Sequence, residues 1–125
     1  MIIGVGIDIV EIERIRRIIE HYGDKFIERI FTVSERKYCH NKMDYAGCYA
    51  GKFAGKEAFL KALGTGLARN IRWKEIEIIT EKSGKPQIIV KGNVLRLIEQ
   101  LNIIRIYISI SHSKENAMAM VILEN

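Results

Sequence analysis

The stretch Gly51-Lys-Phe-Ala-Gly-Lys-Glu-Ala-Phe-Leu-Lys61 lies inside the longest helical pattern of this chain. That pattern runs over residues 44–63 without a proline and is followed by Gly64-Thr-Gly66, which predicts a helix that ends at a glycine. Gly51 and Gly55 each cost a helix about 1 kcal/mol relative to alanine. We therefore expect another element to pack closely against this part of the helix.

An alternating pattern near the start of the chain predicts a strand with two unlike faces. Positions 3, 5, 7 and 9 are apolar, whereas Gly4, Gly6 and Asp8 stand between them. Glycine weakens a strand unless a backbone, a helix or a ligand approaches closely. Close packing of a helix is the interpretation we favour for the glycine face, which ends in the carboxylate of Asp8.

Two acids and one amine in these segments suit a metal-bound pyrophosphate. Glu57 and Lys61 are four residues apart and share one helix face. Asp8 could meet Glu57 across a cleft, where two carboxylates and substrate phosphates would supply the oxygen ligands that Mg²⁺ prefers. The spacing alone leaves the structural alternative open, because helical pairs four residues apart are usually solvated salt bridges.

Composition predicts one compact domain over residues 1–125, of which 48% are apolar. We see neither a signal peptide nor a run of roughly 18 apolar residues, so we expect a cytoplasmic protein without a membrane partner. The net charge of +5 favours an acidic partner or ligand. Aromatic residues do not alternate with the basic ones, so nucleic acid is not the expected partner.

The remaining patterns predict an α+β fold, with a mainly antiparallel sheet packed against one long helix and shorter helices. Turn residues at 82–86 and 111–116 join predicted strands into two hairpins. Further helices are expected over 11–23, 24–30, 32–37 and 92–101, and strands over 75–81, 87–90, 104–111 and 117–123.

The cysteines are expected to be two ordinary thiols. Cys39 and Cys48 are nine residues apart and form no CxxC motif. Intracellular chains of this size rarely use disulfides.

Ser111 and His112 do not predict a catalytic dyad, because neighbours on a strand point to opposite faces. His112 has the parity of the apolar positions 104–110 and extends that face to the rim of the sheet. Two roles stay open: a structural, hydrogen-bonded histidine, or phosphate recognition together with the hydroxyls of Ser111 and Ser113.

Five ordered motifs together resemble the holo-acyl-carrier-protein synthases, the small bacterial members of the 4'-phosphopantetheinyl transferases. The resemblance extends over nearly the whole chain. The motifs are Gly4-x-Gly-Ile-Asp8-Ile-Val-Glu-Ile-x-Arg14, Arg29-Ile-Phe-Thr-x-x-Glu35, Phe53-Ala-x-Lys56-Glu57-Ala-x-x-Lys61-Ala-x-Gly64-Thr-Gly66, Gly84-Lys-Pro86 and Ser109-Ile-Ser-His112-Ser.

The resemblance implies transfer of the 4'-phosphopantetheine arm from coenzyme A to a serine of apo acyl carrier protein, with release of adenosine 3',5'-bisphosphate. It also implies Mg²⁺ held by Asp8 and Glu57, and a homotrimer with coenzyme A in clefts between subunits. Lys61 would add charge stabilisation. The base that takes the serine proton stays open between Glu57 and a metal-bound water.

The resemblance also implies a set of binding residues. Lys52 and His112 are expected at the 3'-phosphate, Gly64 and the Gly84–Pro86 turn at the adenosine end, and Phe53 and Lys56 elsewhere along the cofactor. Arg14 is expected to face the acidic carrier protein. The weaker candidates for that contact are Arg16, Arg17 and Lys25.

Two other classes of function compete with this transferase. One is a non-catalytic basic module that binds an acidic protein or nucleic acid, in which Asp8 and Glu57 are structural acids. The other is a nucleotide hydrolase that uses water as the acceptor.

Overall fold

The computed structural model describes residues 1–67 and 70–125. The elements, in chain order, are β1 (Ile2–Glu11), α1 (Ile12–Tyr22), α2 (Asp24–Ile30), α3 (Val33–His40), α4 (Tyr45–Leu63), the 3-10 helix η1 (Trp73–Glu75), β2 (Ile76–Thr80), β3 (Pro86–Val90), α5 (Gly92–Gln100), β4 (Arg105–His112) and β5 (Asn116–Glu124).

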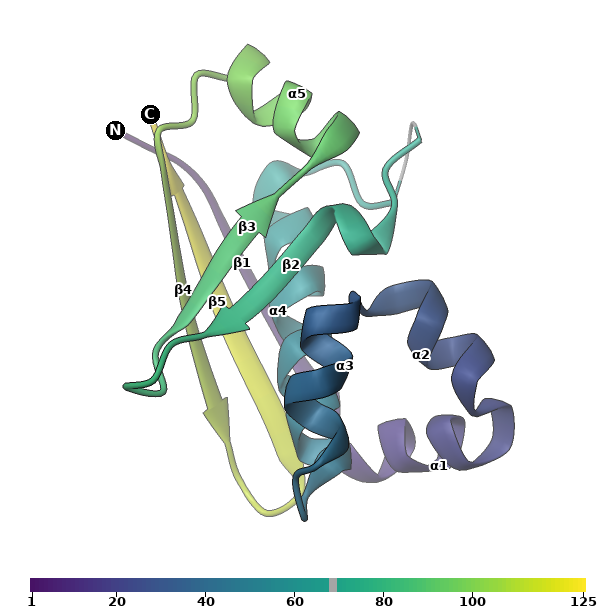
Figure 1. Cartoon of the computed structure of the whole chain (residues 1–125). Coiled ribbons are helices and arrows are strands. Elements are labelled where there is room, and N and C mark those ends of the chain that lie inside the picture. Colours follow the sequence, from purple (N-terminus) through teal and green to yellow (C-terminus); the bar gives the residue numbers. More distant parts are fainter. Residues whose placement is uncertain (68–69) are drawn as a thin grey trace.

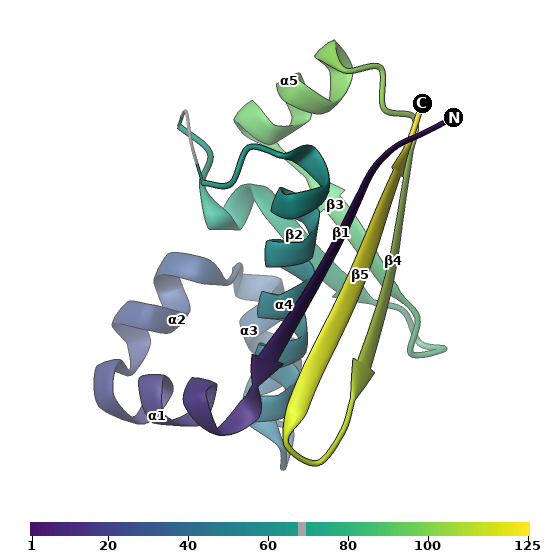
Figure 2. The same ribbon diagram turned by 180° about the vertical axis from the view of Figure 1, so that it is seen from behind.

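The architecture is α+β with antiparallel strand pairing, as predicted. Strands β1, β5 and β4 form one sheet in that order, and β2 and β3 form a separate two-stranded sheet. Helix α4 runs along one face of the larger sheet, and helices α1, α2 and α3 lie beyond it (Figures 1 and 2). The main difference from expectation is that the strands divide into two sheets.

The glycines of β1 allow the α4 backbone to touch the strand. A Cβ added at Gly6 would lie 1.9 Å from the Ala58 carbonyl oxygen, and one added at Gly4 would lie 2.1 Å from that of Ala62. No larger side chain fits such gaps without moving the helix. The favoured interpretation of the glycine face, close helix packing, is therefore confirmed.

The two glycines inside α4 serve the same purpose on other sides of the helix. A Cβ at Gly51 would lie 2.7 Å from the His112 ring, and a Cβ at Gly55 would lie 3.0 Å from the Ile108 side chain. The helix ends as predicted, with Gly64 in the left-handed conformation at φ 78°. Close packing thus compensates for the low helix propensity of these glycines.

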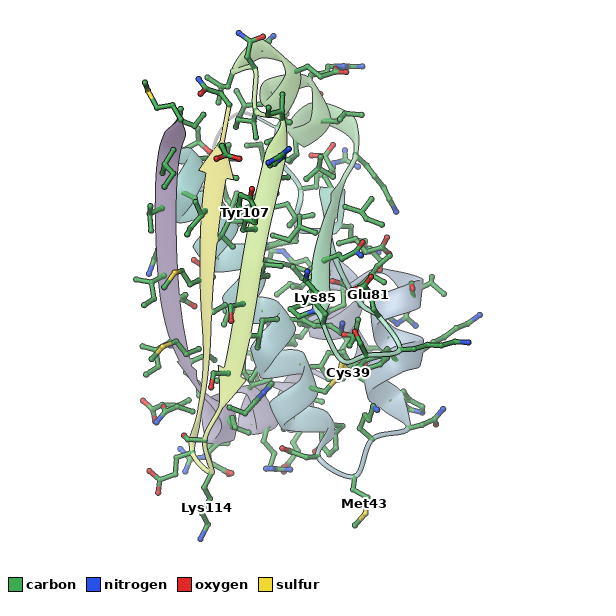
Figure 3. All side chains as sticks on the ribbon, turned by 90° about the vertical axis from the view of Figure 1, so that its left-hand side faces the viewer. Cys39, Met43, Glu81, Lys85, Tyr107 and Lys114 are labelled. Atoms are coloured by element: carbon green, nitrogen blue, oxygen red, sulfur yellow. A yellow bond between two sulfur atoms is a disulfide. The ribbon has the colours of Figure 1, made fainter. Side chains whose placement is uncertain are left out.

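The outward face of the larger sheet is apolar and exposed. Val5, Ile7 and Ile9 of β1 are each more than half exposed, and Met118 and Met120 of β5 lie beside them in the register. Figure 3 shows Tyr107 on the third strand, β4. The apolar positions that alternate along β1 therefore face away from α4.

The two ends of the chain lie side by side at one end of the larger sheet (Figures 1 and 2). The Met1 amino group donates a hydrogen bond to the Asn125 carbonyl at 3.1 Å. The Asn125 amide donates to the Met1 carbonyl at 3.0 Å.

The prediction of two free thiols is wrong: Cys39 and Cys48 form a disulfide. Helix α3 packs on α4 so that the two Cα atoms are 5.5 Å apart, well within the span of a disulfide. This proximity comes from tertiary packing, which neither the spacing of the cysteines nor the redox state of a compartment encodes.

Within the two described ranges, we find no helix with both the length and the apolar character needed to cross a bilayer.

Candidate active site

Helix α4 contributes residues to two separate clefts. The first, cleft A, encloses about 430 Å³ between α3, α4, the β2–β3 hairpin and the end of β4. Its lining consists of Tyr38, Lys42, Met43, Asp44, Gly47, Cys48, Gly51, Lys52, Thr80, Gly84, Pro86, Ile110 and His112.

The second, cleft B, encloses about 460 Å³ and is bounded by β1, α1, α2 and α4. Acidic, basic and apolar side chains meet there. Its lining consists of Asp8, Ile9, Val10, Glu11, Arg14, Ile15, Ile18, Phe26, Phe53, Glu57 and Asn116.

Two of the three residues proposed for chemistry, Asp8 and Glu57, line cleft B, and the third, Lys61, contacts Asp8. The Lys61 ammonium donates to the Asp8 carboxylate at 3.1 Å and to the Ile7 carbonyl at 3.0 Å. Asp8 is mostly buried at 15% side-chain exposure, whereas Lys61 is 53% exposed. The bare face of β1 and the closely packed α4 thus bring together groups from two distant segments.

Burial and the charges of neighbouring side chains shift the pKa of the Glu57 carboxyl group. Burial raises its pKa, the negative charge of Asp8 raises it further, and the Lys61 ammonium opposes the rise. Two carboxylates that repel each other in one cleft gain from a cation placed between them. A divalent cation held by Asp8 and Glu57 would relieve this repulsion.

Those two acids fit the ligand set of Mg²⁺, which takes one or two protein carboxylates and completes its shell with water and phosphate oxygens. Among the described residues, no group of three or more His, Cys, Asp or Glu side chains is arranged to hold a metal.

Cleft A contains a buried cation. Lys52 is 3% exposed, and its ammonium donates to the Ile78 carbonyl at 2.8 Å and to the Thr80 hydroxyl at 3.3 Å. Burial lowers the pKa of Lys52 to about 8. An anion entering the cleft would meet this ammonium and favour its charged form.

His112 also lines cleft A. Its Nε2 is 3.0 Å from the Gly47 carbonyl, so the ring rests against the first turns of α4. Gly84 and Pro86 of the β2–β3 hairpin line the same cleft. The structure thus brings together Lys52, His112, Gly84 and Pro86, four of the expected cofactor residues.

The two clefts open on different sides of α4. Lys52 of cleft A and Glu57 of cleft B are five residues apart, which places them about 140° apart around the helix axis. Gly64 lies farther away, because twelve residues of helix rise separate it from Lys52 by roughly 18 Å. Within one chain, the expected phosphate, metal and adenosine contacts therefore do not form a single pocket.

Lys56 does not reach either cleft. Its side chain is fully buried and donates to the Glu35 carboxylate at 2.7 Å, the Ile30 carbonyl at 2.7 Å and the Trp73 carbonyl at 3.3 Å. Glu35 in turn accepts from the Ile78 amide at 2.8 Å. This network fixes α3 and β2 to α4, and it gives Lys56 a structural position rather than one that contacts a ligand.

The other expected contact residues are spread around cleft B. Phe53 lines it and packs on Trp73, with ring centroids 5.3 Å apart. Arg14 also lines it and is exposed. The remaining basic candidates differ: Arg16 and Arg17 pair with Glu13, and Lys25 is exposed on α2.

Sequence reasoning missed Tyr38, Lys42 and Thr80, which also line cleft A. Thr80 gives no signal, since it ends an ordinary strand. Tyr38 and Lys42 are four residues apart, a spacing at which an aromatic ring and an ammonium can meet on a helix. This spacing is the only sequence feature that indicates a contact between Tyr38 and Lys42.

The family comparison matches nearly the whole chain. A sequence profile of the 4'-phosphopantetheinyl transferase superfamily matches residues 4–120. A holo-acyl-carrier-protein synthase of Solibacter usitatus is 45% identical over 125 residues, which is all of both chains.

Solved structures are similar over the same extent. The crystal structure of holo-acyl-carrier-protein synthase from Neisseria meningitidis has a TM-score of 0.92 at 33% identity and covers both chains completely. That of the Helicobacter pylori enzyme, in complex with coenzyme A, has a TM-score of 0.85 at 33% identity and covers 96% of this chain and 99% of the other.

Proposed function

Because the chain belongs to the 4'-phosphopantetheinyl transferase superfamily, we propose that it transfers the 4'-phosphopantetheine arm of coenzyme A to a serine hydroxyl of apo acyl carrier protein. It would do so as one cytoplasmic domain that prepares carrier protein for fatty-acid synthesis. The observation that carries the proposal is that Asp8 and Glu57 line one cleft, with the Lys61 ammonium on Asp8, in a chain with such relatives.

The reaction exchanges one phosphoester partner for another. A bond forms between the carrier's serine oxygen and the phosphorus that bears the pantetheine arm. The bond from that phosphorus to the bridging oxygen of the diphosphate breaks, and adenosine 3',5'-bisphosphate leaves with the electron pair. The serine hydroxyl is the nucleophile and gives up its proton in the reaction. No nucleophile from this chain is therefore required.

Cleft B supplies the charges that this exchange needs. Asp8 and Glu57 would hold Mg²⁺, which when bound would neutralise the diphosphate and stabilise the charge that develops on it. Lys61, whose ammonium already lies 3.1 Å from Asp8, adds a positive charge beside the reacting phosphates. Phe53 and the apolar side chains of α1 and α2 line the same cleft and would limit the access of water to the reacting groups.

Cleft A is proposed to hold the nucleotide end of coenzyme A. All four expected contact residues line this cleft. The Lys52 ammonium and the His112 ring would contact the 3'-phosphate, and Gly84 and Pro86 would contact the adenosine. Lys52 is already held by Ile78 and Thr80, so it needs little reorganisation to meet a phosphate.

In a homotrimer with sites shared between subunits, cleft A of one subunit and cleft B of another would form one binding site. The 140° separation of Lys52 and Glu57 around α4 argues against one cofactor molecule reaching both within a chain. The exposed apolar face formed by Val5, Ile7 and Ile9 of β1 with Met118 and Met120 of β5 is a surface that a second copy would cover. Cleft A of one subunit would then face cleft B of its neighbour.

The carrier protein is proposed to dock at the rim of cleft B. Arg14 lines this cleft and is exposed, so it can meet an acidic surface next to the reacting phosphates. Arg17 and Lys25, both exposed, would extend this basic rim over α1 and α2.

Intact mass spectrometry of the carrier protein tests the proposed transfer. Incubation of the chain with apo carrier protein, coenzyme A and Mg²⁺ is expected to add one phosphopantetheine group, about 340 Da, to the carrier. Omission of coenzyme A is the control and should leave the mass unchanged. A carrier that binds the chain but gains no mass would favour a basic binding module. Consumption of coenzyme A without carrier would favour a hydrolase.

A further inference from the structure

The aromatic ring of Tyr38, which lines cleft A, lies near two ammonium groups. The Lys42 nitrogen lies 4.5 Å from the centre of its ring, and the Lys52 nitrogen lies 4.7 Å from it. Tyr38 belongs to the last turns of α3, Lys42 to the segment that follows, and Lys52 to α4. One aromatic ring thus connects cations from separate parts of the chain.

The two lysines differ in burial and in the contacts that hold them. Lys52 is buried and fixed by the Ile78 carbonyl and the Thr80 hydroxyl. Lys42 is exposed, and no ion pair holds it among the described residues. Like charges repel, so Lys42 would turn to solvent unless something else attracts its ammonium. The face of the Tyr38 ring provides that attraction.

We propose that Tyr38 is a positioning residue that holds Lys42 and Lys52 together for one phosphate group, and that it thereby sets a preference for 3'-phosphorylated coenzyme A over 3'-dephospho-coenzyme A. This inference rests on the proposed function of cleft A. Two ammonium groups near one ring form a site for a doubly charged phosphate, whereas a 3'-hydroxyl gains little from them. The cations already beside the ring favour this role over stacking of the ring on a base.

Comparison of Tyr38→Phe with Tyr38→Leu distinguishes the contribution of the aromatic ring from that of the rest of the side chain. Phenylalanine keeps the aromatic face, so KM for coenzyme A should stay within about twofold of the unaltered protein. Leucine removes the face, and KM for coenzyme A should rise roughly three- to tenfold with kcat unchanged. KM for 3'-dephospho-coenzyme A should not change with either. Tyr22→Leu, at an exposed tyrosine that lines neither cleft, is the matched control.

A double-mutant cycle with Lys42→Met tests the same contact without depending on one variant. If Tyr38 acts by holding Lys42, Tyr38→Leu should raise KM for coenzyme A less in the Lys42→Met background than alone. Independent effects of the two substitutions would overturn the inference. So would a Tyr38→Leu protein with the normal ratio of the two KM values, or a Tyr38→Phe protein that behaves like Tyr38→Leu.

Failure of this inference can be distinguished from failure of the proposed function. If the unaltered protein modifies the carrier but has equal KM values for the two cofactors, the placement of the 3'-phosphate in cleft A is wrong. If the carrier gains no mass with either cofactor, the transferase proposal itself is wrong. If the unaltered protein discriminates and Tyr38→Leu discriminates equally, only the role of Tyr38 is wrong.

Discussion

Among single residues, Asp8 and Glu57 are the side chains on which the proposed transfer depends most. Each variant, Asp8→Ala or Glu57→Ala, deletes an oxygen ligand from a preformed site and should lower kcat about 100-fold or more at limiting Mg²⁺. The melting temperature should change little, because removal of either carboxylate relieves repulsion within cleft B, and the ion pair with Lys61 that Asp8→Ala removes is half exposed on the lysine side.

Glu99→Ala is the control for this pair, since Glu99 is exposed on α5 and lines neither cleft. Its turnover should be normal. Near-normal turnover of Asp8→Ala or Glu57→Ala at limiting Mg²⁺ would contradict the metal assignment.

Lys52 should make the use of coenzyme A depend on pH. Burial lowers the pKa of Lys52 to about 8, and the amine loses its charge as the pH rises through that value. The charged fraction falls about tenfold by pH 9. The ratio of kcat/KM for coenzyme A to that for 3'-dephospho-coenzyme A should therefore be constant near pH 7 and fall above pH 8.

Lys52→Arg is the informative comparison, because a guanidinium stays charged throughout this range. The ratio for this variant should be independent of pH up to 9.5. A ratio that is constant with pH in the unaltered protein would show that Lys52 does not meet the phosphate.

Arg14 should affect the carrier protein more than the cofactor. Arg14→Glu reverses a charge at the rim of cleft B and should raise KM for the carrier roughly tenfold, with a much smaller effect on KM for coenzyme A. Arg96→Glu, on the exposed side of α5, is the matched charge reversal. Steady-state kinetics with each substrate varied in turn would measure the two KM values. Equal changes in both would refute docking at Arg14.

At the scale of elements, the contact between β1 and α4 is the one that builds the site. Gly6→Ala would place a methyl group 1.9 Å from the Ala58 carbonyl and force the helix off the strand. We expect a loss of roughly 3 kcal/mol in the free energy of unfolding. Turnover should also fall, because Asp8 is two residues further along the same strand.

Urea unfolding measures this loss, with Ile2→Ala as the comparison for Gly6→Ala. Ile2 is 58% exposed on the same strand, so its truncation should cost less than about 0.5 kcal/mol. Equal stability of the two variants would mean that the strand and helix can separate without penalty.

The bounds of the elements could largely be predicted from sequence, because local patterns set them. The helix expected over 32–37 forms as α3, which Thr32 and Glu35 cap, and Gly64 ends α4 at the predicted glycine. The division into two sheets depends on long-range pairing that no local pattern encodes. For the same reason, the disulfide between Cys39 and Cys48 was missed.

The candidate site was predictable where the family motifs fix the residue and its neighbours. Asp8 and Glu57 line one cleft with Lys61 bonded to Asp8, and Lys52, His112, Gly84 and Pro86 line the other. Lys56 shows the limit of such inference. Its spacing from Lys52 suggests a shared surface, but only the fold shows that it is buried against Glu35.

At the scale of the whole molecule, the proposed trimer makes activity depend on the outward face of β1. Val5→Glu places a charge where a second copy would pack, and burying an unpaired charge costs several kcal/mol. Light scattering should show three times the mass of one chain for the unaltered protein and a smaller mass for the variant. Carrier modification should fall at least tenfold, although Val5 lines neither cleft.

Lys114→Glu, at the tip of the β4–β5 turn (Figure 3), is the control for this substitution. It changes charge away from the apolar face and should leave the mass in solution and the turnover unaltered. A Val5→Glu protein that is monomeric but fully active would show that one chain suffices for catalysis.

The paired chain ends open a route to circular permutation. Met1 and Asn125 are hydrogen-bonded to each other, so a linker of a few residues could join them without disturbing β1 or β5. New ends introduced beside Lys114 would lie at the other end of the sheet. The rearranged protein would keep the strand that carries Asp8 covalently continuous with its partner β5, and fusion partners could be attached at either end of the molecule.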